Sequence, residues 1–164
     1  MKAKNAFFLF LALLLPVAVF LFLKVFGRNE FKVPVRHGEA DLTVPAQCNF
    51  EYPTPYIIAD SLMRNIRMNN NDSVFVLYAD PSDETSMNRV RTEFEGDPLH
   101  VVSTDSLANT IDPTLLRECI LLMKGDSSVA LVDHRNRIRG YYIGSDRDEA
   151  HRLIVEIKII LRQY

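Results

Sequence analysis

Cysteine is scarce in this chain, with only Cys48 and Cys119 among its 164 residues. Two cysteines exclude a dense disulfide framework, and the sequence shows no internal repeat or collagen-like period. A charged fraction of 24% and an aromatic fraction of 10% are typical of a chain with a packed core, which excludes bulk disorder. At this length we expect one folded domain.

Catalytic and nucleotide-binding motifs are also missing. The chain contains no Gly-x-Ser-x-Gly, no glycine-rich phosphate loop and no His-Glu-x-x-His, which are signatures of common hydrolases, nucleotide-binding proteins and zinc peptidases. A dispersed Ser/His/Asp triad stays open, because such triads have no local sequence signature. We predict that the chain is not an enzyme, and we predict no cofactor.

Basic residues do not gather into a nucleic-acid-binding stripe. Residues 1–28 carry four basic side chains and no acidic one, whereas residues 29–164 carry 15 basic and 21 acidic side chains, a formal charge of −6. An acidic domain repels phosphate backbones, and no basic run with interleaved aromatic residues is present. We therefore predict no nucleic-acid partner.

The first 26 residues contain an apolar segment of membrane length. Residues 6–23 are 18 residues without a charge, and a helix of that length spans roughly 27 Å, close to the ~30 Å hydrocarbon core of a bilayer. A cleaved signal peptide is the alternative, but the segment ends in Leu-Lys-Val-Phe-Gly-Arg, which lacks a small-x-small cleavage site. We predict an uncleaved transmembrane helix over residues 1–26.

The orientation of this segment depends on its flanking charges. Basic residues lie on both sides of it, so the positive-inside rule nearly balances. A short basic tail before the span is typical of a signal anchor, which keeps the N-terminus inside. We predict a single-pass protein of the inner (plasma) membrane whose soluble domain is extracytoplasmic, on the periplasmic side.

The rest of the chain divides into a tether and a domain. Residues 27–55 contain four prolines and are predicted to form a tether with little regular structure. Aromatic residues at its end are expected to pin it onto the domain: Phe50, Tyr52 and Tyr56. The domain is predicted over residues 56–164.

Apolar periodicity and turn residues define the elements of this domain. Strands are predicted at residues 73–79, 99–103, 129–132 and 138–142, helices at 59–68, 80–95, 112–122 and 146–162, and a turn at 69–72. Ser145 is expected to cap the last helix. A helix between the first two strands implies a parallel pair, and the last two strands form an antiparallel hairpin. The pattern indicates an α/β thioredoxin-like sandwich, a central mixed sheet with flanking helices.

Two segments carry a resemblance to a known family. The stretch VALVDHRNRIRGYYIGSDRDEAHRLIVEIKIIL resembles the end of the Sco/SenC family of thioredoxin-like copper chaperones, and PTPYIIAD resembles its entry segment. The resemblance covers residues 52–164 and implies a thioredoxin-like strand order. It also implies work in the cell envelope, such as respiratory oxidase biogenesis.

The chain departs from that family at each copper ligand. Members use a Cys-x-x-x-Cys after the first core strand and a later histidine, but residues 81–86 contain no cysteine and residues 124–127 contain no histidine. His134 is nearby but falls in the hairpin turn, out of register. The resemblance therefore transfers no catalytic or metal-binding residue.

Cys48, Cys119 and His134 are the candidates left for metal or redox chemistry. The two cysteines are 71 residues apart, so their spacing gives no support for a metal site. We expect Cys119 to be a core residue; a structural disulfide between the two, and a redox or copper role for Cys48, stay open. His134 could join Arg135, Arg137 and Arg139 in a small basic patch, but we favour a solvated hairpin face.

The remaining polar candidates favour structural roles. The other histidines have no partner at metal-ligand spacing and are expected to be structural: His37, His100 and His151. The acidic residues after the first strand could hold a hard cation, although helix-start electrostatics explains them more simply: Asp80, Asp83 and Glu84. The same explanation applies to Asp146, Asp148 and Glu149.

Three functions are compatible with these features. The first is a membrane-anchored, non-catalytic thioredoxin-like protein that binds a protein partner during envelope assembly. The second is a copper carrier or thiol–disulfide oxidoreductase that uses Cys48 and Cys119 in a non-standard site. The third is a purely structural envelope component. Among these we favour the first.

Overall fold

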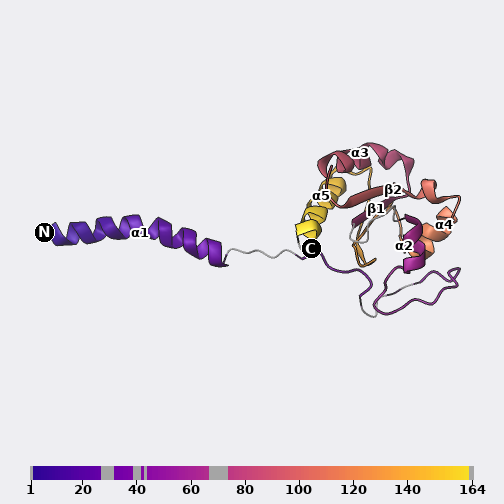
Figure 1. Cartoon of the computed structure of the whole chain (residues 1–164), viewed down its shortest axis with the longest axis horizontal. Coiled ribbons are helices and arrows are strands. Elements are labelled where there is room, and N and C mark those ends of the chain that lie inside the picture. The colour runs from indigo at the N-terminus through magenta and orange to yellow at the C-terminus, as the bar shows by residue number, and fades with distance from the viewer. Residues whose placement is uncertain (1, 27–31, 39–41, 43, 67–73, 163–164) are drawn as a thin grey trace. The chain divides into compact units, whose positions relative to one another are not determined.

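A computed structural model describes residues 2–26, 32–38, 42, 44–66 and 74–162 of the chain. The chain divides into two compact units, Met1–Phe31 and Lys32–Tyr164, which are coloured along the sequence in Figure 1. Each unit is described by itself below.

The first unit consists of one helix, α1 (Lys2–Phe26), with Pro16 inside it. Its described apolar side chains are exposed, for example Phe10 at 63% and Leu13 at 69%. No helix in the described part of the chain meets the length and hydropathy of a membrane span. The anchor that the sequence predicts over residues 1–26 stays a prediction.

The second unit is built on a mixed four-stranded sheet in the order β2-β1-β3-β4. The strands are β1 (Val74–Tyr78), β2 (Leu99–Ser103), β3 (Val129–Val132) and β4 (Ile138–Tyr142). β1 is parallel to β2, and β3 is antiparallel to both β1 and β4. The predicted parallel pair and hairpin are confirmed, and β1 is fully buried, as expected for a central apolar strand.

Helices cover both faces of the sheet, which gives an α/β architecture (Figure 1). On one face, α3 (Glu84–Glu93) and α5 (Arg147–Arg162) bury Met87, Val90 and Leu153 against Val76 and Leu131 of the sheet. On the other face lie α2 (Asp60–Ile66), α4 (Pro113–Leu115) and the π-helical turn η3 (Leu116–Ile120). Their apolar residues form a second core with the opposite side chains of β1 and β3. Side chains therefore alternate between the two cores along each central strand.

Most predicted element boundaries are confirmed to within a few residues. The helix predicted at 59–68 is α2, and its last two positions, the turn at 69–72 and Ser73 lie outside the described residues. The expectation that Ser145 caps α5 is wrong. Asp146 is the cap, because its Oδ1 accepts hydrogen bonds from the backbone N–H groups of Asp148 at 2.8 Å and Glu149 at 3.1 Å.

The segment before α2 has no helix or strand in its described part, but it is bound to the domain. The N–H of Arg36 donates to the carbonyl of Ile138 on β4 at 2.8 Å, and the Arg139 guanidinium donates to the carbonyl of Val33. Further along, the N–H of Tyr56 donates to the carbonyl of His37 at 3.0 Å. The segment around Val33 and Arg36 therefore lies beside β4, the outer strand on that side of the sheet.

Candidate functional site

A cleft of about 600 Å³ lies at the carboxyl end of β1, and we call it the β1-end cleft. Because β3 runs antiparallel to β1 and β4 runs antiparallel to β3, the loop before β3 and the loop after β4 lie at the same end of the sheet as the carboxyl end of β1. In α/β sheets, ligands most often bind at the carboxyl ends of the strands. The lining residues are Ala79, Asp80, Pro81, Arg117, Gly125, Asp126, Ser128, Ile143 and Ser145.

The Asp80-Pro81 sequence starts a short 3-10 turn, η1 (Pro81–Asp83), at the mouth of this cleft. Asp80 Oδ1 accepts a hydrogen bond from the N–H of Ser82 at 2.8 Å, and Pro81 occupies the first helical position, where no N–H is needed. The hydrogen bond from Ser82 lowers the pKa of the exposed Asp80 carboxyl. Asp80 therefore acts mainly as a helix-start cap, as the sequence predicts.

Asp83 differs from its neighbours because it is buried, with only 1% of its surface exposed. Neither of its carboxylate oxygens has a hydrogen-bond partner among the described residues. The carboxylate lies against Gly144: a Cβ atom at Gly144 would be 2.4 Å from Asp83 Cγ. A residue with a side chain at position 144 would thus collide with this buried acid.

Burial raises the pKa of Asp83, and the charge of Asp80 raises it further. The Ser128 hydroxyl and the Ser145 N–H lie close enough to lower the pKa, but neither makes a hydrogen bond of ordinary geometry, and burial prevails. The Ser128 Oγ also accepts a hydrogen bond from the N–H of Gly144 at 3.1 Å. The site therefore combines a charged exposed acid, Asp80, with a desolvated one.

The three acids that the sequence groups together do not form one cation site. Glu84 Oε2 accepts a hydrogen bond from the Tyr78 hydroxyl, and its Oε1 accepts one from Arg91 at 2.9 Å. These contacts lower the pKa of Glu84 and hold it on α3, away from Asp83. Within the described ranges, no three His, Cys, Asp or Glu residues are grouped to hold a metal ion.

Cys48 and Cys119 form a disulfide, with Cα atoms 5.4 Å apart. This pairing is one of the alternatives that the sequence left open. Cys119 lies in η3 and is 3% exposed, which confirms its place in the core. Because both sulfurs are bonded to each other, neither is available as a thiolate ligand while the bond stands.

Aromatic residues fasten the chain beside this disulfide. The Tyr52 hydroxyl donates to the carbonyl of Cys119 at 2.9 Å, and the Tyr56 hydroxyl donates to the carbonyl of Ile120 at 2.6 Å. The predicted pinning by these two tyrosines is confirmed, whereas Phe50 stays 48% exposed and makes an edge contact with Tyr52. The sequence thus predicted the aromatic contacts but not the covalent bond next to them.

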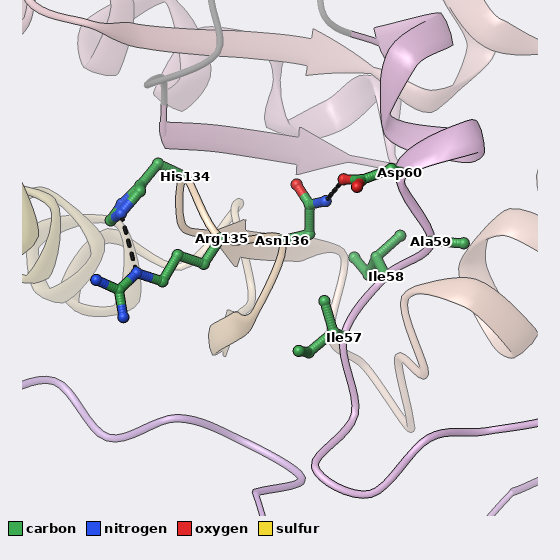
Figure 2. Close-up of a pocket in the computed structure, with 7 residues that line it drawn as sticks. All are labelled: Ile57, Ile58, Ala59, Asp60, His134, Arg135 and Asn136. Atoms are coloured by element: carbon green, nitrogen blue, oxygen red, sulfur yellow. Dashed lines mark hydrogen bonds between the residues drawn. The ribbon is translucent and has the colours of Figure 1, made fainter.

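A second pocket, of about 340 Å³, contains His134 (Figure 2). Figure 2 shows the Asn136 amide pointing at Asp60, with a hydrogen bond of 2.6 Å, while His134 Nε2 accepts one from Arg135 Nε at 3.3 Å. The other lining residues are Ile57, Ile58 and Ala59. No cysteine or second histidine lines this pocket, so its lining gives no soft-metal ligand set.

The basic patch considered for the hairpin is not a surface patch. Arg137 and Arg139 bind Asp133 Oδ2 at 2.7 and 3.1 Å, and Asp133 is 0% exposed. The solvated hairpin face that the sequence favoured holds in part: Arg135 is exposed, whereas Arg139 is only 5% exposed. The side chains of the predicted patch are divided between a buried ion-pair network and the His134 pocket.

Two of the remaining histidines have ring contacts consistent with structural roles. His100 stacks on Phe75 with ring centroids 5.5 Å apart, and His37 Nε2 lies 2.9 Å from the Tyr141 hydroxyl.

Compared with family models, with curated proteins and with solved structures, the chain matches none.

Proposed function

We propose that this chain is a membrane-anchored, non-catalytic, thioredoxin-like protein that binds a protein partner at the β1-end cleft. The observation that carries the proposal is the β1–α3 junction. It lies at the edge of the sheet where a thioredoxin-like protein keeps its thiols, yet residues 79–84 contain none. The β1-end cleft is lined in part by charged and hydroxyl side chains, and no cysteine is among its lining residues.

The thioredoxin-like assignment is supported by topology. The strand order β2-β1-β3-β4 combines a parallel β1–β2 pair, an antiparallel hairpin and helices on both faces. One face carries α3, which follows β1, and α5, which follows the hairpin. This is the arrangement that the Sco/SenC resemblance of residues 52–164 implies.

The location rests on two features from different parts of the chain. Residues 6–23 carry no charge over the length of a bilayer core. The Cys48–Cys119 disulfide favours an oxidising compartment, because cytosolic thiols are kept reduced. Together they support a single-pass inner-membrane protein with an extracytoplasmic domain.

The partner class follows from the same resemblance. A thioredoxin-like domain without its thiols keeps the binding surface of the fold and loses the exchange reaction. We therefore propose a binding role in the assembly of an envelope complex, with respiratory oxidase biogenesis as the process that the Sco/SenC resemblance implies. No nucleic acid takes part in this proposal.

Site-specific photo-crosslinking of the full chain in its native envelope tests this function. A photoreactive phenylalanine analogue at Ser145, in the cleft, is expected to give a discrete crosslinked protein. The same analogue at Asp97, an exposed turn residue at the opposite end of α3 and β1, is the matched control. No crosslink from Ser145, or the same product from Asp97, would contradict partner binding at the cleft.

The location has a separate test. Envelopes trapped with N-ethylmaleimide during lysis are expected to contain the chain with Cys48 and Cys119 oxidised and unlabelled. Two labelled cysteines would place the domain in a reducing compartment.

The alternative function, a copper carrier or thiol–disulfide oxidoreductase, has one observation in its favour: the fold brings Cys48 and Cys119 together. However, exchange at the half-buried Cys48 sulfur would expel Cys119 as a thiolate inside the core, where its negative charge is removed from water, so Cys119 is a poor leaving group. Titration of the reduced chain with Cu(I), beside a variant lacking both cysteines, decides this alternative. Stoichiometric binding that the variant loses would support it.

A further inference from the structure

The sheet has two outer strands, and in the described part of the molecule only one of them is covered by the chain itself. Beside β4 lies the segment around Val33 and Arg36. On the other side, β2 pairs with β1 and with no further strand of the described residues. An uncovered outer strand offers a row of backbone N–H and C=O groups to another strand. The β2 edge is therefore a place where a strand can be added to the sheet.

β2 also lacks the features that usually prevent outer strands from pairing. Residues 99–103 (LHVVS) contain no proline, no lysine and no acidic residue, and their register with β1 runs without a bulge. All five residues are partly exposed. Three of them are apolar: Leu99, Val101 and Val102. The strand thus presents a regular, uncharged edge.

The pairing with β1 determines which backbone groups of β2 point outward. The N–H of Val74 donates to the carbonyl of Pro98 at 2.9 Å, and Val74 is in register with Leu99. In a parallel pair of this register, the even-numbered residues of β2 direct their N–H and C=O groups to β1, and the odd-numbered residues direct theirs away from it. The outward residues are Leu99, Val101 and Ser103.

These three residues carry six outward groups, and two of the six are engaged at the ends of the strand. The N–H of Leu99 donates to the carbonyl of Asp97 at 2.7 Å, and the Ser103 carbonyl accepts a hydrogen bond from the Ser106 hydroxyl at 2.6 Å. Four groups are left without a partner among the described residues. They are the carbonyl of Leu99, the N–H and carbonyl of Val101, and the N–H of Ser103, which are arranged symmetrically about Val101.

This arrangement is complementary to itself. When a second copy of β2 lies antiparallel, with Val101 opposite Val101, each Val101 N–H reaches the Val101 carbonyl of the other copy. Each Ser103 N–H then reaches the Leu99 carbonyl of the other copy, so all four groups are used and neither engaged group is needed. A strand of another protein would need the matching pattern by coincidence, whereas a second copy of the chain matches it by symmetry.

The helix beside β2 carries charges that fit the same symmetry. α3 contacts β2 (Figure 1), and its Glu93 forms an ion pair with Lys158 of α5 at 2.5 Å, so this side of α3 faces α5. Glu84 precedes Glu93 by about two and a half helical turns and points to the opposite side, where it binds Arg91 at 2.9 Å. A twofold axis places α3 antiparallel to its copy, so the Glu84 end of each helix lies toward the Arg91 end of the other, and opposite charges attract.

We propose that the chain forms a symmetric dimer in which β2 of one copy pairs antiparallel with β2 of a second copy, with the twofold axis at Val101. The two four-stranded sheets then form one continuous sheet, and α3 lies beside its copy on one face of it. None of the residues 99–103 lines the β1-end cleft. The dimer surface is therefore separate from the surface proposed for the protein partner.

Cysteine crosslinking of the full chain in detergent micelles tests the pairing and its register. Residues of a hydrogen-bonded antiparallel pair have Cα atoms about 5.5 Å apart, which a disulfide can bridge. Val101→Cys is expected to give a covalent dimer on mild oxidation, because position 101 lies opposite itself. The native Cys48 and Cys119 are bonded to each other and do not compete.

The neighbouring outward positions are the matched controls. Leu99→Cys alone and Ser103→Cys alone are expected to stay monomeric on the gel, since each position lies about 14 Å from its own copy. An equimolar mixture of these two variants is expected to crosslink, because position 99 of one copy lies opposite position 103 of the other. This pattern is specific to a twofold axis at Val101.

Sedimentation equilibrium of two further variants measures the backbone contribution. Val101→Pro removes the outward N–H and leaves the pairing with β1 in place, so it is expected to raise the dimer dissociation constant about tenfold or more. Val101→Ala is the matched control: it also loses the valine side chain but keeps the N–H, and its dissociation constant is expected to lie well below that of Val101→Pro.

A charge variant tests the same pairing if Val101→Pro does not fold, which near-ultraviolet circular dichroism reports. Asp97 and Asp105 are exposed just beyond the two ends of β2, and the antiparallel pair brings Asp97 of each copy toward Asp105 of the other. Asp105→Lys replaces this repulsion by attraction and is expected to lower the dissociation constant about threefold.

Several outcomes overturn the proposal. These are the absence of a covalent dimer from Val101→Cys, equally efficient crosslinking by Leu99→Cys alone, and equal dissociation constants of Val101→Pro and Val101→Ala. An unchanged constant in Asp105→Lys overturns it where that variant decides. The proposed function fails separately, because a second copy captured from Asp97 in the photo-crosslinking experiment differs in mass from a partner captured from Ser145.

Discussion

Removal of the Cys48–Cys119 bond is predicted to lower the stability of the domain by several kcal/mol. The bond closes a loop of 71 residues, and the loop-entropy relation for a closure of that length gives about 4.4 kcal/mol at 25 °C. Most of this effect arises in the unfolded chain, which gains conformations once the bond is gone. The hydrogen bonds of Tyr52 and Tyr56 beside it are expected to stay in place.

The size of this effect can be converted into a melting temperature. The second unit runs from Lys32 to Tyr164, and at about 2.1 cal/mol/K of unfolding entropy per residue its total is about 0.28 kcal/mol/K. A loss of about 4.4 kcal/mol therefore lowers Tm by about 16 °C. The variant to measure is Cys48→Ala/Cys119→Ala, because alanine avoids placing a hydroxyl in the core at position 119.

The assay is thermal unfolding of the full chain in micelles, followed by near-ultraviolet circular dichroism, which reports tertiary packing rather than the helix content of α1. Native chain treated with dithiothreitol is the control and should melt with the double variant, since both lack the bond. A Tm lowered by less than about 3 °C would refute the reasoning, because it would mean that noncovalent contacts already close the loop in the unfolded state.

Three further predictions concern buried acids. Burial raises the pKa of Asp83, so the native state holds a proton that the unfolded chain, with a value of about 3.9, has already released. The contribution of Asp83 to stability is therefore present below the pKa of the unfolded chain and is lost as pH rises through the raised pKa of the folded state. Asp83→Asn should remove this loss, and the idea is wrong if the native chain and the variant show the same pH dependence of urea unfolding between pH 3 and pH 8. Gly144→Ala is expected to destabilise the fold by about 1–3 kcal/mol, because the new Cβ would be 2.4 Å from Asp83 Cγ; in a double-mutant cycle with Asp83→Ala, additive effects would contradict this contact. Asp133→Asn removes the charge that Arg137 and Arg139 share and is expected to cost about 3–5 kcal/mol in urea unfolding, whereas a loss below about 1 kcal/mol would show that water satisfies both guanidinium groups.

The strands could be predicted from the sequence because their signals are local. Strands β2, β3 and β4 begin and end at the predicted residues, since apolar β-branched runs are bounded there by turn residues. The cap of α5 was placed one residue early because Ser145 and Asp146 are both good caps, and only the backbone geometry selects the carboxylate. Local chemistry thus identifies an element more reliably than its terminal residue.

The features of the site were less accessible because they depend on distant contacts. Nothing in a spacing of 71 residues indicates that Cys48 and Cys119 meet. The sequence grouped Asp83 with Asp80 and Glu84 because they are close along the chain. In the fold, Gly144 packs against Asp83. Glu84 is hydrogen-bonded to Tyr78 and Arg91 instead. A carboxylate that is buried by a glycine 61 positions away leaves no mark on its own neighbourhood.

The disulfide also turns part of the chain into a covalent ring, from Cys48 to Cys119. Both parallel strands, β1 and β2, and the helix α3 between them lie inside this ring. A protease that cuts once at the exposed turn near Gly96 opens the ring but releases no fragment, so the clipped protein migrates as one molecule until it is reduced. A cut after residue 119 lies outside the ring, so the C-terminal fragment is no longer covalently attached to the rest of the chain even before reduction.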